Sequence, residues 1–177
     1  MSLDGFREKV EAAALQRKGE AIFNASTDHA AIIAEVMFGT AMKRMRILTG
    51  ALFAPVYATD AALANAKKFL DERNGKLSIL IEHADDAGDH PFFQRFGAHR
   101  NVEVRVVPDE LQTTYSYHLL VADDDSYRFE RDKLNHSAVA AFGDRAGAAS
   151  LGSVFDDLWT NTPKSAVAIG RTELVTT

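Results

Sequence analysis

Along the chain, segments whose apolar residues recur with the period of a helix alternate with segments that have the period of a strand. Residues 4–18 are rich in Ala, Glu, Lys and Arg, which favour a helix that Gly19 can end. A short apolar strand is expected at 21–23. Ser26, Thr27 and Asp28 then offer an N-cap for a helix to about Arg44. Its apolar residues wrap most of the way round, which predicts burial in a core or against a partner.

Further apolar segments have the length and period of strands, namely 46–50, 76–82, 101–107, 117–122, 127–131 and 138–142. Helical patterns follow Thr59, Pro91 and Arg145. This alternation predicts an α/β fold with a mixed, largely parallel sheet flanked by helices. We expect an N-terminal helical arm at 1–20, one α/β domain at 21–162 and a C-terminal tail at 163–177.

Composition narrows the range of functions. The chain has 177 residues, 20 Lys and Arg against 25 Asp and Glu, and a formal net charge of −5. No broad nucleic-acid surface is therefore expected, because such a surface needs surplus cations. The absence of cysteine excludes disulfides and thiolate chemistry. The most apolar stretch, 30–42, is too short to cross a bilayer, so we expect no membrane insertion and a cytoplasmic location.

One histidine stands out because it enters an apolar strand that an acidic turn follows. His118 begins the run His-Leu-Leu-Val-Ala, and Asp125 closes the turn that comes after it. Asn135 lies ten residues further on. The spacing resembles one half of the phospholipase D superfamily, whose motif is His-x-Lys, four residues, Asp, six residues and Gly-Ser-x-Asn. Leu120 stands where that motif has its lysine, and Asp132-Lys133 replace the Gly-Ser pair.

The resemblance reaches beyond the motif, from about Ile22 to Trp159, and includes a closing helix with Phe155, Leu158 and Trp159. It implies a phospholipase-D-like half in which His118, Asp125 and Asn135 occupy the catalytic positions. In the family, a histidine attacks a phosphodiester while lysines and asparagines hold the phosphoryl oxygens. A leucine in place of one such cation predicts a loss of about 10² to 10³ in rate.

We therefore expect a catalytically degenerate domain with a binding or regulatory role. A phosphate-containing ligand would be held by His118, Asn135, and Lys133 or Arg128. Two alternatives stay open. One is an active phosphodiesterase or nuclease that uses His118 across a homodimer, since one chain carries one half-site and isologous dimers are the commonest assembly. The other is a structural interaction domain that uses the helix at 32–38, with His118 as a core residue.

The segment 82–90, Glu-His-Ala-Asp-Asp-Ala-Gly-Asp-His, follows a predicted buried strand. Carboxylates and imidazoles can bind a divalent metal, but this spacing matches no defined metal motif. A solvated acidic turn is the better interpretation. We expect no metal and no cofactor, since the sequence also lacks a P-loop and a Gly-x-Gly-x-x-Gly fingerprint.

Overall fold

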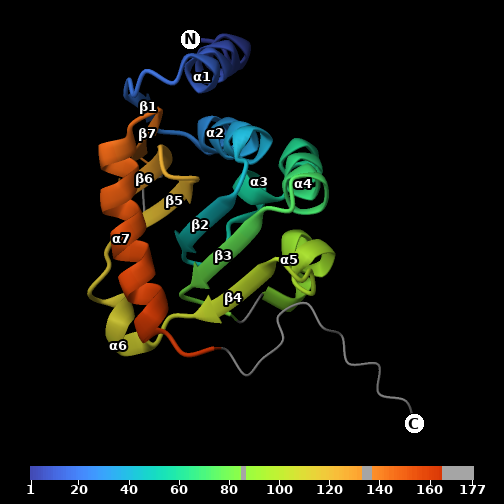
Figure 1. The fold of residues 1–177 in the computed structure, drawn as a ribbon, viewed down its shortest axis with the longest axis vertical. Helices are drawn as coiled ribbons and strands as arrows, with labels where there is room; N and C mark the ends of the chain where they lie inside the picture. Colours follow the sequence, from blue (N-terminus) through green and yellow to red (C-terminus); the bar gives the residue numbers. More distant parts are fainter. Residues whose placement is uncertain (85–86, 133–136, 165–177) are drawn as a thin grey trace.

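The computed structural model describes residues 1–84, 87–132 and 137–164, and the described residues form a seven-stranded sheet flanked by helices (Figure 1). The strands are β1 (Ile22–Asn24), β2 (Arg44–Thr49), β3 (Lys76–Ile81), β4 (Val102–Val106), β5 (His118–Ala122), β6 (Ser126–Asp132) and β7 (Ser137–Phe142). The α-helices are α1 (Leu3–Gln16), α2 (Thr27–Thr40), α3 (Ala54–Tyr57), α4 (Asp60–Lys67), α5 (Pro91–Phe96), α6 (Asp109–Gln112) and α7 (Arg145–Asn161). Two short turns of other helix types, η1 (Lys68–Glu72) and η2 (Ala87–Asp89), complete the elements.

The sheet is mixed, as expected, but the prediction that it is largely parallel is wrong. Its order is β1-β7-β6-β5-β2-β3-β4, and only the pairs β2–β3 and β3–β4 are parallel among the described strands. The remaining neighbours, from β1 through β2, pair antiparallel. Helices separate β2, β3 and β4 along the chain, which permits parallel crossovers. Among the described residues, no helix lies between β5, β6 and β7, and these strands pair antiparallel with each other.

Helices cover both faces of the sheet and create two cores. On one face, α1 to α5 pack on the sheet through a cluster that contains Phe38, Phe69, Phe92, Ile79 and Leu120. On the other face, α7 lies along the sheet and buries Phe155 and Leu158 against strand residues (Figure 1). Side chains alternate between the two faces along each strand. Neighbouring residues of β5 therefore belong to different cores.

Helix α2 lies inside the molecule. Ile33, Met37 and Phe38 are fully buried in the main core, and both Ile32 and Val36 are also buried. The sequence left open whether this apolar helix faces a core or a partner, and the structure shows a core. A structural interaction domain that uses residues 32–38 as its interface is therefore excluded, because that surface is already covered.

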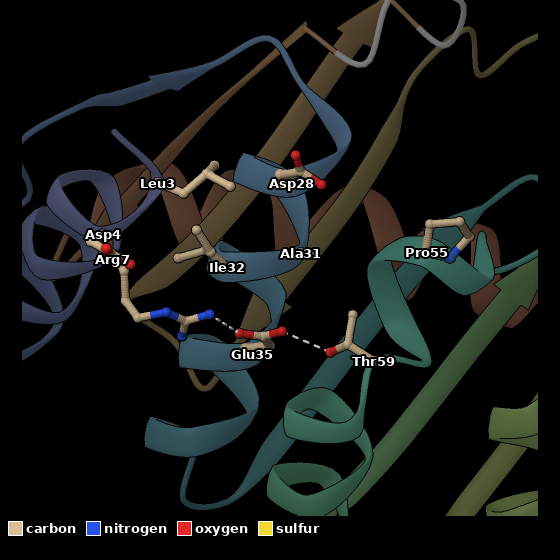
Figure 2. A pocket seen from close by; sticks show the side chains of 9 residues that line it. All are labelled: Leu3, Asp4, Arg7, Asp28, Ala31, Ile32, Glu35, Pro55 and Thr59. Atoms are coloured by element: carbon tan, nitrogen blue, oxygen red, sulfur yellow. Dashed lines mark hydrogen bonds and ion pairs between the residues drawn. The ribbon is translucent and has the colours of Figure 1, made fainter. Parts of the chain in front are cut away.

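The N-terminal helix α1 packs on α2 through Phe6, Val10 and Ala14, which belong to the main core. A polar contact adds to this packing. Arg7 donates to Glu35 of α2 at 2.6 Å, and the Thr59 hydroxyl donates to the other oxygen of that carboxylate at 2.7 Å (Figure 2). The carboxylate of Glu35 thus joins α2, in which it lies, to α1 and to the turn before α4. Among the described residues, no helix is both long enough and apolar enough to cross a membrane.

Candidate functional site

Strand directions bring His118 to the carboxyl edge of the parallel strands. Because β5 runs antiparallel to β2, its first residue lies beside the end of β2, where Leu119 pairs with Leu48. The chain leaves β2 at Gly50, whose carbonyl oxygen accepts from the backbone N–H groups of Glu82 and His83 at 2.8 and 2.9 Å. A Cβ atom built on Gly50 would lie 3.7 Å from the His118 imidazole. The ends of β2 and β3 therefore meet at this histidine.

A cavity of about 160 Å³ opens beside the imidazole of His118. Three segments supply its walls: the end of β2, the turn leading into α3 together with α3 itself, and the β5–β6 hairpin. The lining residues are Thr49, Gly50, Ala51, Phe53, Val56, Tyr57, His118, Arg128 and Glu130. Phe53 remains 45% exposed, whereas Val56 and Tyr57 are buried. Apolar and aromatic side chains thus surround a small set of polar groups, which is the usual composition of a small-molecule site.

The Nε2 atom of His118 is buried and has no hydrogen-bond partner among the described residues. The carboxylate of Glu82 lies near it, with Oε2 3.7 Å from Nε2. That separation is too long for a direct hydrogen bond but close enough for electrostatic attraction if the imidazole is protonated. Glu82 itself is buried at the end of β3. A carboxylate of the acidic segment 82–90, and not that of Asp125 in the turn after β5, therefore lies beside this nitrogen.

Leu120, which occupies the lysine position of the resembled motif, is 1% exposed and belongs to the main core. Arg128 pairs with Leu120 across the β5–β6 ladder, and Glu130 pairs with His118. The guanidinium of Arg128 donates to the carboxylate of Glu130 at 2.8 Å, and both side chains are buried. A cation thus lies on the strand next to Leu120, as the sequence allowed for Arg128, but a carboxylate compensates its charge.

Tyr57 contributes a phenol that stays neutral over the physiological range. Burial raises the pKa of Tyr57 to about 12; the nearby Arg128 lowers it, and the charge of Glu130 adds to the rise. A buried phenol can donate one hydrogen bond without carrying charge. The cavity therefore holds neutral or mutually compensated polar groups among its described residues.

The structure does not bring Asp125 to His118. Asp125 lies at the turn between β5 and β6, at the other end of the strand, where its carboxylate binds Arg17 and accepts from the Ser126 hydroxyl. Burial acts to raise the pKa of Asp125, but the hydrogen bonds from Arg17 and Ser126 outweigh it and lower that pKa below its usual value. In this structure Asp125 anchors the turn. Asn135 and Lys133, the other predicted site residues, lie outside the described residues.

The acidic segment after β3 contributes to structure in two ways. His90 caps α5 by accepting the backbone N–H of Phe92 at 3.1 Å, and burial lowers the pKa of His90. Glu82 faces His118, while residues 85 and 86 are outside the described part of the chain. Over the ranges that the structure describes, no three His, Asp or Glu side chains are grouped closely enough to hold a metal ion.

A second hollow, of about 330 Å³, lies between α1, α2 and the turn before α4 (Figure 2). Its polar floor is Glu35, whose carboxylate oxygens already accept from Arg7 and Thr59. Asp4 and Asp28 at its rim belong to the first turns of α1 and α2, where carboxylates favour the helix dipole. The polar groups of this hollow thus either hold helices together or stabilise the first turns of α1 and α2.

Several residues of the cavity could not be identified as site residues from the sequence. Glu130 could have been found by counting outward from the hairpin turn, since that register places it opposite His118. Glu82 was considered only as a metal ligand. Phe53 precedes the short helix α3 and Tyr57 ends it, and this segment carries no motif, so nothing in the sequence indicated that they would line this cavity.

No protein-family model matches the sequence, and a search of curated proteins finds no match. Solved structures do match. TrmBL2, an archaeal chromatin protein whose structure shows a novel mode of DNA binding, is 14% identical with a TM-score of 0.61; the match covers 92% of this chain and 62% of that protein. Nuc from Salmonella typhimurium, a phospholipase D family member, is 11% identical with a TM-score of 0.57, over 84% of this chain and 97% of Nuc.

NucT from Helicobacter pylori is also 11% identical, with a TM-score of 0.60, over 84% of this chain and all of NucT. The chain thus spans nearly the whole of Nuc and NucT but under two thirds of TrmBL2. At such low identities the likeness concerns the fold. It confirms, at that level, the resemblance first indicated by His118, Asp125 and Asn135: this chain has the fold of the phospholipase D superfamily.

Proposed function

We propose that this protein is a catalytically degenerate phospholipase-D-like domain that binds a ligand at the His118 cavity without turning it over. The observation that carries the proposal is the replacement of the motif lysine by Leu120, which is buried in the core. Phosphoryl transfer builds negative charge on the phosphoryl oxygens, and preplaced cations supply much of the stabilisation. An aliphatic side chain supplies none.

The neighbouring groups support this proposal. Arg128 could in principle replace the missing cation, but its guanidinium is already paired with Glu130. The Nε2 atom of His118 is buried, so the nitrogen that faces Glu82 is not open to an incoming phosphorus atom. A nucleophile needs both access and nearby electrophilic groups. Neither requirement is met by the described residues around Nε2.

A phosphate-containing ligand was the expectation from the resemblance, and the charges of the described site make it the weaker choice. Glu82 and Glu130 place two carboxylates near His118, against the single guanidinium of Arg128. Nor do we extend the DNA binding of TrmBL2 to this chain, because the likeness concerns the fold and the net charge is −5. The proposal therefore concerns binding at the cavity, and not recognition of a polyanion.

The rival function is a working phosphodiesterase in which two chains pair their His118 residues. A homodimer remains part of our expectation, because isologous pairs are the commonest assembly and Phe53 leaves an exposed aromatic surface at the cavity. Sedimentation velocity reports whether the chain is dimeric. Dimerisation alone would not restore the missing lysine, because each copy carries Leu120.

Cleavage assays with purified full-length chain distinguish the two functions. We would incubate the wild type, His118→Ala and the control His99→Ala with single-stranded DNA, duplex DNA and phosphatidylcholine vesicles. His99 lies between α5 and β4, where its Nε2 is 3.1 Å from a carboxylate oxygen of Asp71. We expect the three proteins to give the same background rate on every substrate. Cleavage that His118→Ala abolishes and His99→Ala leaves intact would overturn the proposal.

A further inference from the structure

The His118 cavity has a size and lining that define which class of molecule it can take. Its volume of about 160 Å³ is close to that of an engineered apolar cavity of about 150 Å³ that holds benzene. It is too small for a nucleotide or a phospholipid headgroup with its glycerol to be enclosed. The volume therefore fits a compound of a single ring.

The walls favour a flat, mainly apolar molecule. Phe53, Tyr57 and His118 present aromatic rings to the cavity, and Ala51 and Val56 add aliphatic surface. Aromatic side chains pack well against another ring, in stacked or edge-to-face arrangements. A Cβ atom built on Gly50 would already touch the imidazole at an ordinary contact distance of 3.7 Å, so the glycine keeps this part of the wall free of a side chain. Any side chain at this position would reduce the space beside His118.

The polar groups at the cavity favour an uncharged ligand. Arg128 and Glu130 form a buried ion pair at 2.8 Å, so an incoming anion would have to compete with Glu130 for the guanidinium. Tyr57 and Thr49 bring hydroxyl groups that donate or accept without charge. An anion in this enclosed space would lose its hydration without gaining a free cation among the lining residues. A single hydroxyl or N–H group on the ring has partners here.

We propose that the His118 cavity binds a small, uncharged, single-ring compound that carries one hydrogen-bonding group. This inference rests on the proposed function, because it assumes that the site binds and does not turn over its ligand. It extends that function by naming the ligand class. It also departs from the phosphodiester that the fold suggests, since the guanidinium of Arg128 is already paired with Glu130.

Phenol and phenyl phosphate provide a matched pair of probes with the same ring and different charge. Each would be titrated into the full chain, and binding followed through the backbone amide signal of Gly50 and the imidazole carbon signals of His118. We expect saturable shifts with phenol and binding of phenyl phosphate at least about tenfold weaker, a difference of about 1.4 kcal/mol, because the buried phosphate would lose its hydration without a free cation among the lining residues to pair with.

Two variants locate the site, and a third serves as a control. Gly50→Ala adds a methyl group into the cavity at an ordinary contact distance, and Ala51→Leu fills it further if the first change is too small. Gly88→Ala makes the same glycine substitution where the new methyl group meets nothing within 4 Å. We expect Gly50→Ala and Ala51→Leu to weaken phenol binding progressively, and Gly88→Ala to leave it unchanged. Thermal unfolding of each variant checks that it is folded.

Three outcomes would overturn the inference: no saturable shift with phenol, binding of phenyl phosphate as tight as phenol or tighter, or phenol binding that neither cavity variant weakens. None of these involves cleavage. Failure of the proposed function appears instead as His118-dependent hydrolysis, which the binding titrations do not measure. The two experiments can therefore fail separately.

Discussion

At the scale of single residues, the chemistry of the site depends on which side chains β5 and β6 present to the α2 face of the sheet. His118 and Leu120 point to the same face, and their cross-strand partners Glu130 and Arg128 lie beside them. The imidazole borders the cavity, whereas Leu120 is enclosed by the core. Two residues along the same face of the strand thus separate a position that borders the cavity from a fully buried one.

Replacing Leu120 with lysine tests whether the lost cation can be restored. Because Leu120 is 1% exposed, we expect Leu120→Lys to bury an ammonium group and to cost about 3 kcal/mol or more of unfolding free energy. Leu120→Met, which keeps volume and polarity, should cost less than about 1.5 kcal/mol. Urea denaturation measures both values. A stable Leu120→Lys protein that gains phosphodiesterase activity would show that the residues around this position can still support phosphoryl transfer.

The buried phenol of Tyr57 predicts a loss of stability at alkaline pH. Its pKa is raised from 10.0 to about 12, so its contribution is fully present below pH 10 and is lost as pH rises towards 12. A difference of about two pKa units corresponds to roughly 3 kcal/mol. We expect Tyr57→Phe to flatten this part of the stability profile. Tyr115→Phe, outside the cavity, should leave the profile as in the wild type, and an unchanged profile for Tyr57→Phe would contradict the assignment.

At the scale of elements, periodicity predicted where helices and strands lie but not how the strands run. The strand expected at 117–122 is β5 at His118–Ala122, and the helix expected from Arg145 is α7. The direction of β5 depends on its insertion beside β2, a long-range contact that no local pattern reports. Local patterns are equally limited in predicting the residues of the site. His118 and Arg128 follow from hairpin register, whereas Tyr57 and Glu82 reach the site through tertiary packing.

The turn between β5 and β6 illustrates how an apparently solvated acidic run can hold elements together. Asp123 adopts a left-handed conformation, with φ of 51°, and its carboxylate accepts the backbone N–H groups of Met42, Lys43 and Arg44. Asp124 binds Arg44 at 2.5 Å, and Asp125 binds Arg17. The three aspartates thus connect the hairpin to the start of β2 and to the end of α1.

We expect Asp123→Ala to lower the free energy of unfolding by about 2 kcal/mol, because it removes three hydrogen bonds and places an alanine in the left-handed region. Asp123→Asn should lose less, since its side-chain oxygen still accepts and asparagine tolerates this conformation. Guanidinium denaturation of the two variants provides the comparison. Equal losses in both would mean that the carboxylate charge, and not the backbone geometry, is what matters.

At the scale of the whole molecule, the layers position the candidate site away from the N-terminal helix. The cavity lies at the carboxyl edge of β2 and no residue of α1 lines it. Helix α1 packs on α2, on the face that holds the main core (Figure 1). The link between α1 and the rest of the chain includes the contact of Arg7 with Glu35, which is 7% exposed at its side chain (Figure 2). Loosening α1 should therefore leave the site intact.

Arg7→Met tests this separation. The substitution keeps most of the apolar stem but removes the hydrogen bond to the buried Glu35 carboxylate, so we expect a cost of about 1 to 3 kcal/mol. Hydrogen exchange should accelerate in α1 and stay unchanged in β5 and β6. Glu11→Gln, which removes the exposed partner at 4.0 Å from Arg7, should have almost no effect. Faster exchange across β5 would instead show that α1 and the site are coupled.

The ratio of cleavage rates for the wild type and His118→Ala on bis(4-nitrophenyl) phosphate tests the central claim most directly. Its activated leaving group needs no proton from a general acid, so even a weakened histidine nucleophile would be detected. With Leu120 in the core, Arg128 bound to Glu130 and Nε2 buried, our account predicts a ratio of one. A wild-type rate well above that of His118→Ala would contradict it, because the scaffold would then still carry out phosphoryl transfer.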